Sequence, residues 1–128
     1  MTEGSYIYEY ALIRYIPSVE RGEFINVGLV MMCKRLKRVR VKTHIDRRRL
    51  EAFRCPHSIE EIERQLEAFS LICDADASGR QLSSLPAEER FRWLTAVRSA
   101  CIRTSRPHPG VTLDFDNTFN RLFTDLVL

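Results

Sequence analysis

The sequence predicts a single α+β domain in which an antiparallel sheet of three to four strands packs with about four helices. The N-terminal third contains runs rich in β-branched and aromatic residues, separated by short connections, which are typical of an antiparallel meander. Further along the chain, apolar residues recur at helical spacing. The length of 128 residues fits one domain over residues 1–128, and no linker or internal repeat divides it.

Three strands are expected in the N-terminal meander. Residues 6–16 are rich in aromatic and β-branched side chains. Residues 24–33 are apolar on both faces except at Asn26 and Gly28, which indicates a central, covered strand. A glycine inside a strand also indicates a bulge or a close approach of the backbone. Residues 38–43 alternate between basic and β-branched side chains, as a strand does when one side faces water.

Two helices are expected in the middle of the chain. Asp46 is a suitable N-cap for a short helix that follows the third strand. Ser58 and Glu61 form a capping box for a longer helix. The apolar residues of that longer helix have helical spacing: Ile59, Ile62, Leu66, Phe69 and Cys73. Residues 74–84 read as an exposed loop.

Two more helices are expected towards the end of the chain. Pro86 suits the first turn of the third helix, and its predicted buried stripe is Phe91, Leu94, Val97 and Cys101. Residues 102–105 can add a fourth, edge strand, which is followed by a proline-containing stretch. The last helix starts at Asp114 or Asp116, and its predicted apolar stripe is Phe115, Phe119, Leu122 and Leu126.

The charges are distributed in blocks. Residues 34–54 have a local net charge of +8, whereas residues 58–76 have a local net charge of −5. A basic strand face followed by a basic helix could follow a phosphate backbone, so the block is a candidate nucleic-acid-binding surface. Alternatively, it is a solvated face that pairs with the acidic helix at residues 60–67. The candidate residues are Arg38, Arg40, Lys42, Arg47, Arg48 and Arg49.

A polar motif around the first hairpin is the second candidate site. The segment E-R-G-E-F-I-N-V-G places polar side chains near Arg14, where arginines could hold a phosphate and Glu23 could act as a base. Alternatively, Arg14 pairs with Glu23, and Gly22 only permits a turn. The candidate residues for a ligand or a partner are Arg14, Arg21, Glu23 and Asn26.

No metal site and no cofactor are expected. Cys55, His57 and His44 are fewer than the four ligands that structural zinc takes, and no phosphate-binding loop is present. No run approaches the roughly 18 apolar residues that span a bilayer, and the N-terminus does not resemble a secretory signal. We therefore expect a cytoplasmic protein with no membrane contact. The pattern leaves the oligomeric state open.

Three stretches of the sequence resemble the bacterial domain-of-unknown-function family 3037. They are Tyr10-Ala-Leu-Ile-Arg-Tyr15, Arg21-Gly-Glu-Phe-Ile-Asn-Val-Gly28, and a tail from Arg103 to Leu128 that contains Asn120-Arg-Leu-Phe123. The resemblance covers nearly the whole chain and implies a small bacterial protein. The family has no assigned activity, but its members are often encoded beside HipA-like kinases, which implies such a kinase as a partner.

The leading functional hypothesis is a non-catalytic accessory module that interacts with a protein partner. The first alternative is a nucleic-acid-binding protein that uses the basic block. The second alternative is a small enzyme acting on a phosphorylated or nucleotide substrate at the polar motif. The sequence leaves open whether the protein is an enzyme.

Overall fold

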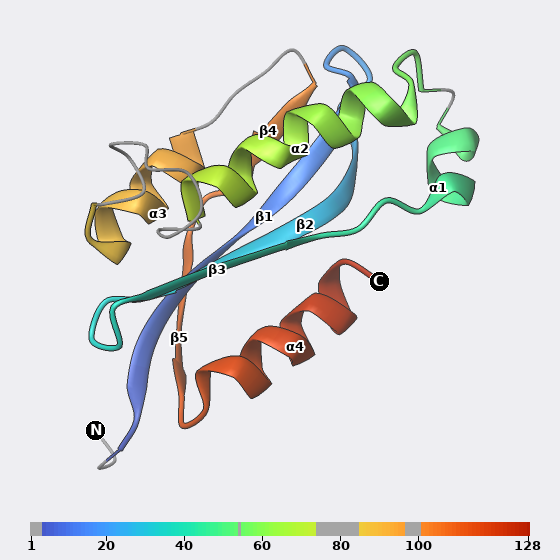
Figure 1. Ribbon diagram of the computed structural model, residues 1–128. Coiled ribbons are helices and arrows are strands. Elements are labelled where there is room, and N and C mark those ends of the chain that lie inside the picture. Colours follow the sequence, from blue (N-terminus) through green and yellow to red (C-terminus); the bar gives the residue numbers. More distant parts are fainter. Residues whose placement is uncertain (1–3, 54, 74–84, 97–100) are drawn as a thin grey trace.

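One antiparallel sheet with helices on both faces makes up the fold (Figure 1). The computed structural model describes residues 4–53, 55–73, 85–96 and 101–128. The strands are β1 (Tyr6–Ser18), β2 (Glu23–Cys33), β3 (Arg38–Thr43), β4 (Ile102–Thr104) and β5 (His108–Thr112). The helices are α1 (Arg47–Ala52), α2 (Ile59–Cys73), α3 (Ala87–Ala96) and α4 (Phe115–Leu126). The predicted α+β class and the N-terminal meander are confirmed.

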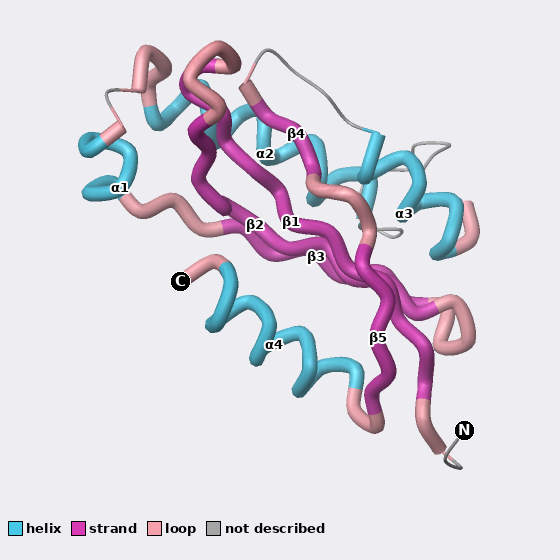
Figure 2. Tube along the Cα trace, turned by 180° about the vertical axis from the view of Figure 1, so that it is seen from behind, coloured by secondary structure: helices cyan, strands magenta, loops and turns pink. Residues whose placement is uncertain are grey.

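The long strand β1 organises the sheet. The strand order is β3-β2-β1-β4, and β5 also pairs with β1. β4 pairs with residues 13–15 of β1 and β5 with residues 6–10, so these two short strands share one edge of β1 (Figure 2). The C-terminal part of the chain therefore completes a sheet that begins at the N-terminus.

A bulge interrupts the pairing of β1 with β2 near Gly28. Ile13 pairs with Gly28, whereas the next residue, Arg14, pairs with Asn26, so Val27 is the extra residue of β2. A Cβ atom on Gly28 would lie 3.1 Å from the backbone oxygen of Lys42. The glycine thus permits both the bulge and the close approach that the sequence predicts.

The sheet separates two hydrophobic cores. The first lies between the sheet and helices α2 and α3, and it contains the fully buried Tyr15 and Phe69. The second lies between the sheet and α4, and it contains Leu29 and Phe119. In the described residues, no helix combines the length and the apolar character needed to cross a membrane.

Helix α4 begins after Asp114, whose side chain accepts a hydrogen bond from the backbone nitrogen of Asn117. Its buried apolar stripe is Phe115, Phe119 and Phe123. Spacing of i, i+4 and i+8 points these rings at the sheet. The predicted positions Leu122 and Leu126 are instead half-buried at the border of this face.

The C-terminal half contains one strand that was not predicted and one prediction that needs correction. Residues 108–112 form β5, although no strand was expected in this proline-containing stretch. Within the described residues β5 pairs with β1 alone, so it is an edge strand, and an edge strand tolerates proline. Cys101 does not belong to the α3 stripe, because it is buried immediately before β4. Val97 of that stripe and the predicted loop at residues 74–84 lie outside the described residues.

Candidate functional site

The basic face of β3 packs against the phenylalanines of α4. The charged groups of Arg38, Arg40 and Lys42 lie 4.7, 4.4 and 4.7 Å from ring centres. The rings they cover are those of Phe115, Phe119 and Phe123, respectively. Every second residue of a strand advances about 6.6 Å, and every fourth residue of a helix advances about 6 Å. Because these repeats nearly match, each cation meets one ring.

Asp116 of α4 neutralises part of this basic face. Arg38 donates two hydrogen bonds to its carboxylate, at 2.9 and 2.8 Å, and Arg40 donates a third at 2.9 Å. The hydrogen bonds from Arg38, with the charges of both arginines, hold the pKa of the Asp116 carboxyl below its usual value. The alternative that the basic block pairs with the acidic helix at residues 60–67 is wrong for Arg38 and Arg40, since their carboxylate partner is on α4.

The remaining candidates for nucleic-acid binding lie on α1. Asp46 caps this helix, as predicted, by accepting hydrogen bonds from the backbone nitrogens of its first turn. Arg47 and Arg48 are exposed there. Arg49 instead donates a 2.8 Å hydrogen bond to the backbone oxygen of Val127 at the end of α4. The six basic candidates therefore do not form one continuous surface that is available to nucleic acid. Four of them contact α4 instead: Arg38, Arg40, Lys42 and Arg49.

The polar motif divides into two separate pairs. Arg21 and Glu23 form an exposed 3.0 Å ion pair at the turn between β1 and β2. Gly22 lies in that turn with φ of +68°, a left-handed conformation that favours glycine. Glu23 is therefore engaged by Arg21 rather than by Arg14, so the pairing of Arg14 with Glu23 suggested by the sequence is wrong.

Arg14 and Asn26 form the second pair, deeper in the sheet. They are directly opposite each other on β1 and β2. The guanidinium carbon of Arg14 lies 4.1 Å from the ring centre of Phe24. The Asn26 amide donates a 3.1 Å hydrogen bond to the backbone oxygen of Leu126, so this side chain fastens the end of α4. Arg14 Nε and Asn26 Oδ1 are buried, and neither has a hydrogen-bond partner among the described residues.

Tyr15 connects the sheet to the segment between α1 and α2. Its hydroxyl is hydrogen bonded to Nδ1 of His57 at 2.8 Å, and the two rings meet edge to face. Burial, together with the neighbouring thiol of Cys55, raises the pKa of the Tyr15 phenol above its ordinary value. The Cys55 thiol donates to the backbone oxygen of Leu50 at 3.0 Å.

The raised pKa of Tyr15 predicts a loss of stability in alkali. The unfolded chain releases the phenol proton near pH 10, whereas the folded chain holds it to higher pH. This contribution is therefore complete below pH 10 and declines as the pH rises above it. We expect urea unfolding to show a steeper decline above pH 10 in the wild type than in Tyr15→Phe. Equal declines in the free energy of unfolding for the two proteins would contradict the raised pKa of Tyr15.

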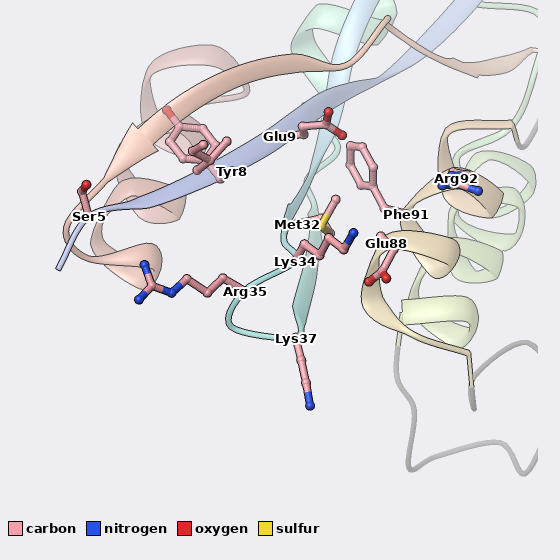
Figure 3. Close-up of a pocket in the computed structure, with 11 residues that line it drawn as sticks. Ser5, Tyr8, Glu9, Met32, Lys34, Arg35, Lys37, Glu88, Phe91 and Arg92 are labelled. Carbon is pink, nitrogen blue, oxygen red and sulfur yellow. The ribbon is translucent and has the colours of Figure 1, made fainter. Parts of the chain in front are cut away.

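A pocket of about 800 Å³ lies between the N-terminal half of β1, the turn from β2 to β3, and α3. Figure 3 shows Glu9, Met32 and Phe91 close together with Lys34 beside them. The rim carries four basic side chains, Lys34, Arg35, Lys37 and Arg92, and two acidic ones, Glu9 and Glu88. The pocket thus has an apolar part at Met32 and Phe91 with Lys34 beside it, whereas Arg35 and Lys37 extend away from that part (Figure 3).

An uncovered part of the sheet continues from this pocket. Ile7 and Val111 are directly opposite each other on β1 and β5. Their side chains are 57% and 62% exposed, because α2 and α3 do not extend over them. We call the surface formed by the exposed side chains of Ile7 and Val111, together with the adjoining pocket lining at the buried Met32 and Phe91, the open face. Sequence reasoning missed it because β5 was not expected, although Ile7 lies in a predicted strand.

Metal ligation receives no support from the part of the chain that the structure describes. Within residues 4–53, 55–73, 85–96 and 101–128, no group of three or more His, Cys, Asp or Glu side chains could hold an ion. The residues brought together by the fold are instead basic and apolar. These groups suit binding to anionic or apolar surfaces.

Comparison with known proteins identifies the family but no function. No curated protein matches the chain, and no solved structure matches it. A family model described as a protein of unknown function, DUF3037, matches residues 10–127. That match includes the polar motif, the bulge, the first core, the second core except for Tyr6 and Tyr8, and α4. The chain therefore belongs to the DUF3037 family.

Proposed function

We propose that this protein is a non-catalytic interaction module whose open face binds an acidic, partly apolar segment of a protein partner. The observation that carries the proposal is the uncovered pair of Ile7 and Val111 beside the apolar part of the pocket. Covering these side chains would remove apolar surface from water, at about 25 cal/mol for each Å². Contiguous apolar surface with a polar rim is typical of protein-binding sites.

The charge of the rim favours an acidic partner segment. Lys34, Arg35 and Lys37 come from one turn, and Arg92 comes from α3 on the other side of the pocket. The charged group of Arg35 lies over the ring of Tyr6, at 5.4 Å from the ring centre, and therefore on the α4 side of β1, so it adds little to the charge that faces the open face. Such rim charges increase the rate of association and select the partner more than they increase affinity. The family resemblance makes a HipA-like kinase the first partner to test.

The test is titration of this protein with a purified HipA-like kinase, the partner class that the family resemblance implies. We expect Ile7→Asp and Val111→Asp each to weaken binding by about tenfold or more, as truncation of a central interface residue does. Val19→Asp is the matched control, since Val19 is 59% exposed but lies in the turn at the other end of β1. All three substitutions are at exposed positions, so folding should be unaffected.

Three outcomes would contradict the proposal. One is equal binding by the wild type and the two open-face variants. Another is recovery of nucleic acid from a low-salt purification, with loss at higher salt and on substitution of Arg47 and Arg48. That result would favour the basic block as the functional surface. The third is turnover of a nucleotide by the purified protein alone, with loss of turnover in Glu23→Gln.

A further inference from the structure

A row of polar side chains crosses the sheet at the end of β1 that is remote from the open face. Asn26 on β2, Arg14 on β1 and Arg103 on β4 are direct neighbours across three strands, which lie side by side in Figure 2. Arg14 is two residues after Leu12 on β1, so both side chains point to the same face of the sheet. Leu12 belongs to the core beneath α4, so the row lies on the face that carries α4. The distance from Ile7 to Arg14 along the strand is about 23 Å.

The two arginines of this row have no counterion in the described structure. Among residues 4–53, 55–73, 85–96 and 101–128, no carboxylate forms an ion pair with Arg14 or Arg103. Arg14 Nε is also buried without a hydrogen-bond partner. Like charges directly opposite on neighbouring strands repel each other, and a part-buried charge without a partner destabilises the fold. An anion bound between them would relieve both effects.

The surroundings of the row restrict its geometry. The ring of Phe24 lies 4.1 Å from the guanidinium carbon of Arg14, which limits the orientations of that planar group. Asn26 and Arg49 donate hydrogen bonds to the backbone oxygens of Leu126 and Val127. These donors cover the negative end of the α4 dipole, which would otherwise disfavour an anion nearby.

We propose that Arg14 and Arg103 bind the phosphate group of a phosphate monoester. A guanidinium presents paired N–H donors that match two phosphate oxygens. Two guanidinium groups complement the dianion of a monoester better than the single charge of a diester. This site is independent of the open face, since the two lie on opposite faces and at opposite ends of β1.

The experiment is calorimetric titration of the whole protein with inorganic phosphate, phenyl phosphate and a dithymidine phosphodiester. We expect the two monoester-type probes to bind more tightly than the diester, with affinity that falls as salt rises. Arg103→Gln should weaken phosphate binding by about tenfold or more, as loss of a charge-assisted hydrogen bond does. Arg103 is exposed, so this variant should fold normally.

Two further variants make the test specific. Arg14→Lys keeps the charge but removes the paired donors, so it should also weaken binding. Arg21→Gln is the control, because Arg21 is an exposed arginine that is paired with Glu23. The proposal is overturned if phosphate does not bind, if Arg21→Gln weakens binding as much as Arg103→Gln, or if the diester binds more tightly than the monoester.

Discussion

Replacement of Phe119 with alanine is expected to lower the free energy of unfolding by about 3–5 kcal/mol. The Phe119 side chain is fully buried at the centre of the core beneath α4. Its ring also stacks on that of Phe123, at 6.5 Å between ring centres, and the guanidinium group of Arg40 lies over the ring face. The truncation would therefore leave a cavity and also remove the ring that the Arg40 cation covers.

Urea or thermal unfolding measures this effect directly. Trp93→Ala is the matched control, because Trp93 is also an aromatic residue of a helix but is 52% exposed. We expect the control to change the free energy of unfolding by about 1 kcal/mol or less. A loss for Phe119→Ala no greater than that of the control would contradict the assignment of α4 as the cover of this face.

Gly110→Ala is expected to destabilise the protein by about 1–3 kcal/mol, which is typical of overpacking. The reason is steric and does not concern backbone freedom, since positive φ among the described glycines is confined to Gly4 and Gly22. A Cβ atom on Gly110 would overlap the end of the Tyr8 ring, and that side chain is only 7% exposed. The ring would have to leave its place over β5, and the second core would open.

A double-mutant cycle tests whether the loss of stability comes from the contact between Gly110 and the Tyr8 ring or from some other effect of the substitution on β5. In the Tyr8→Ala background the ring is absent, so adding Gly110→Ala should have little effect or should stabilise the strand slightly. We expect a coupling free energy of about 1 kcal/mol or more between the two positions. Additive losses would show that Gly110 is required for some reason other than the Tyr8 ring.

Local patterns were sufficient to predict most elements of this fold. Asp46 and Ser58 both accept hydrogen bonds from the first turns of their helices, as their sequence positions indicated. The alternation in residues 38–43 located β3 correctly. β5 could not be predicted in the same way, because only pairing with β1, about a hundred residues earlier, makes a strand of a proline-containing segment.

The candidate sites depended more strongly on tertiary contacts. The sequence identified Arg38 and Arg40 as part of a basic face, but the choice of Asp116 as their partner follows from the docking of α4. Similarly, Arg14 belonged to the polar motif, whereas Arg103 is far away in the chain and joins it only through β4. Charge patterns thus identify residues able to bind, and the fold decides which of them remain without a partner.

The most direct test of the proposed interaction function is a methyl NMR titration of this protein with a HipA-like kinase, the proposed partner. The account predicts that the methyl signals of Ile7 and Val111 shift or broaden on binding. The signals of Val19, at the other end of β1, should remain unchanged. Perturbation confined to Val19, or no perturbation of Ile7 and Val111 at saturating partner, would contradict the assignment of the open face as the docking surface.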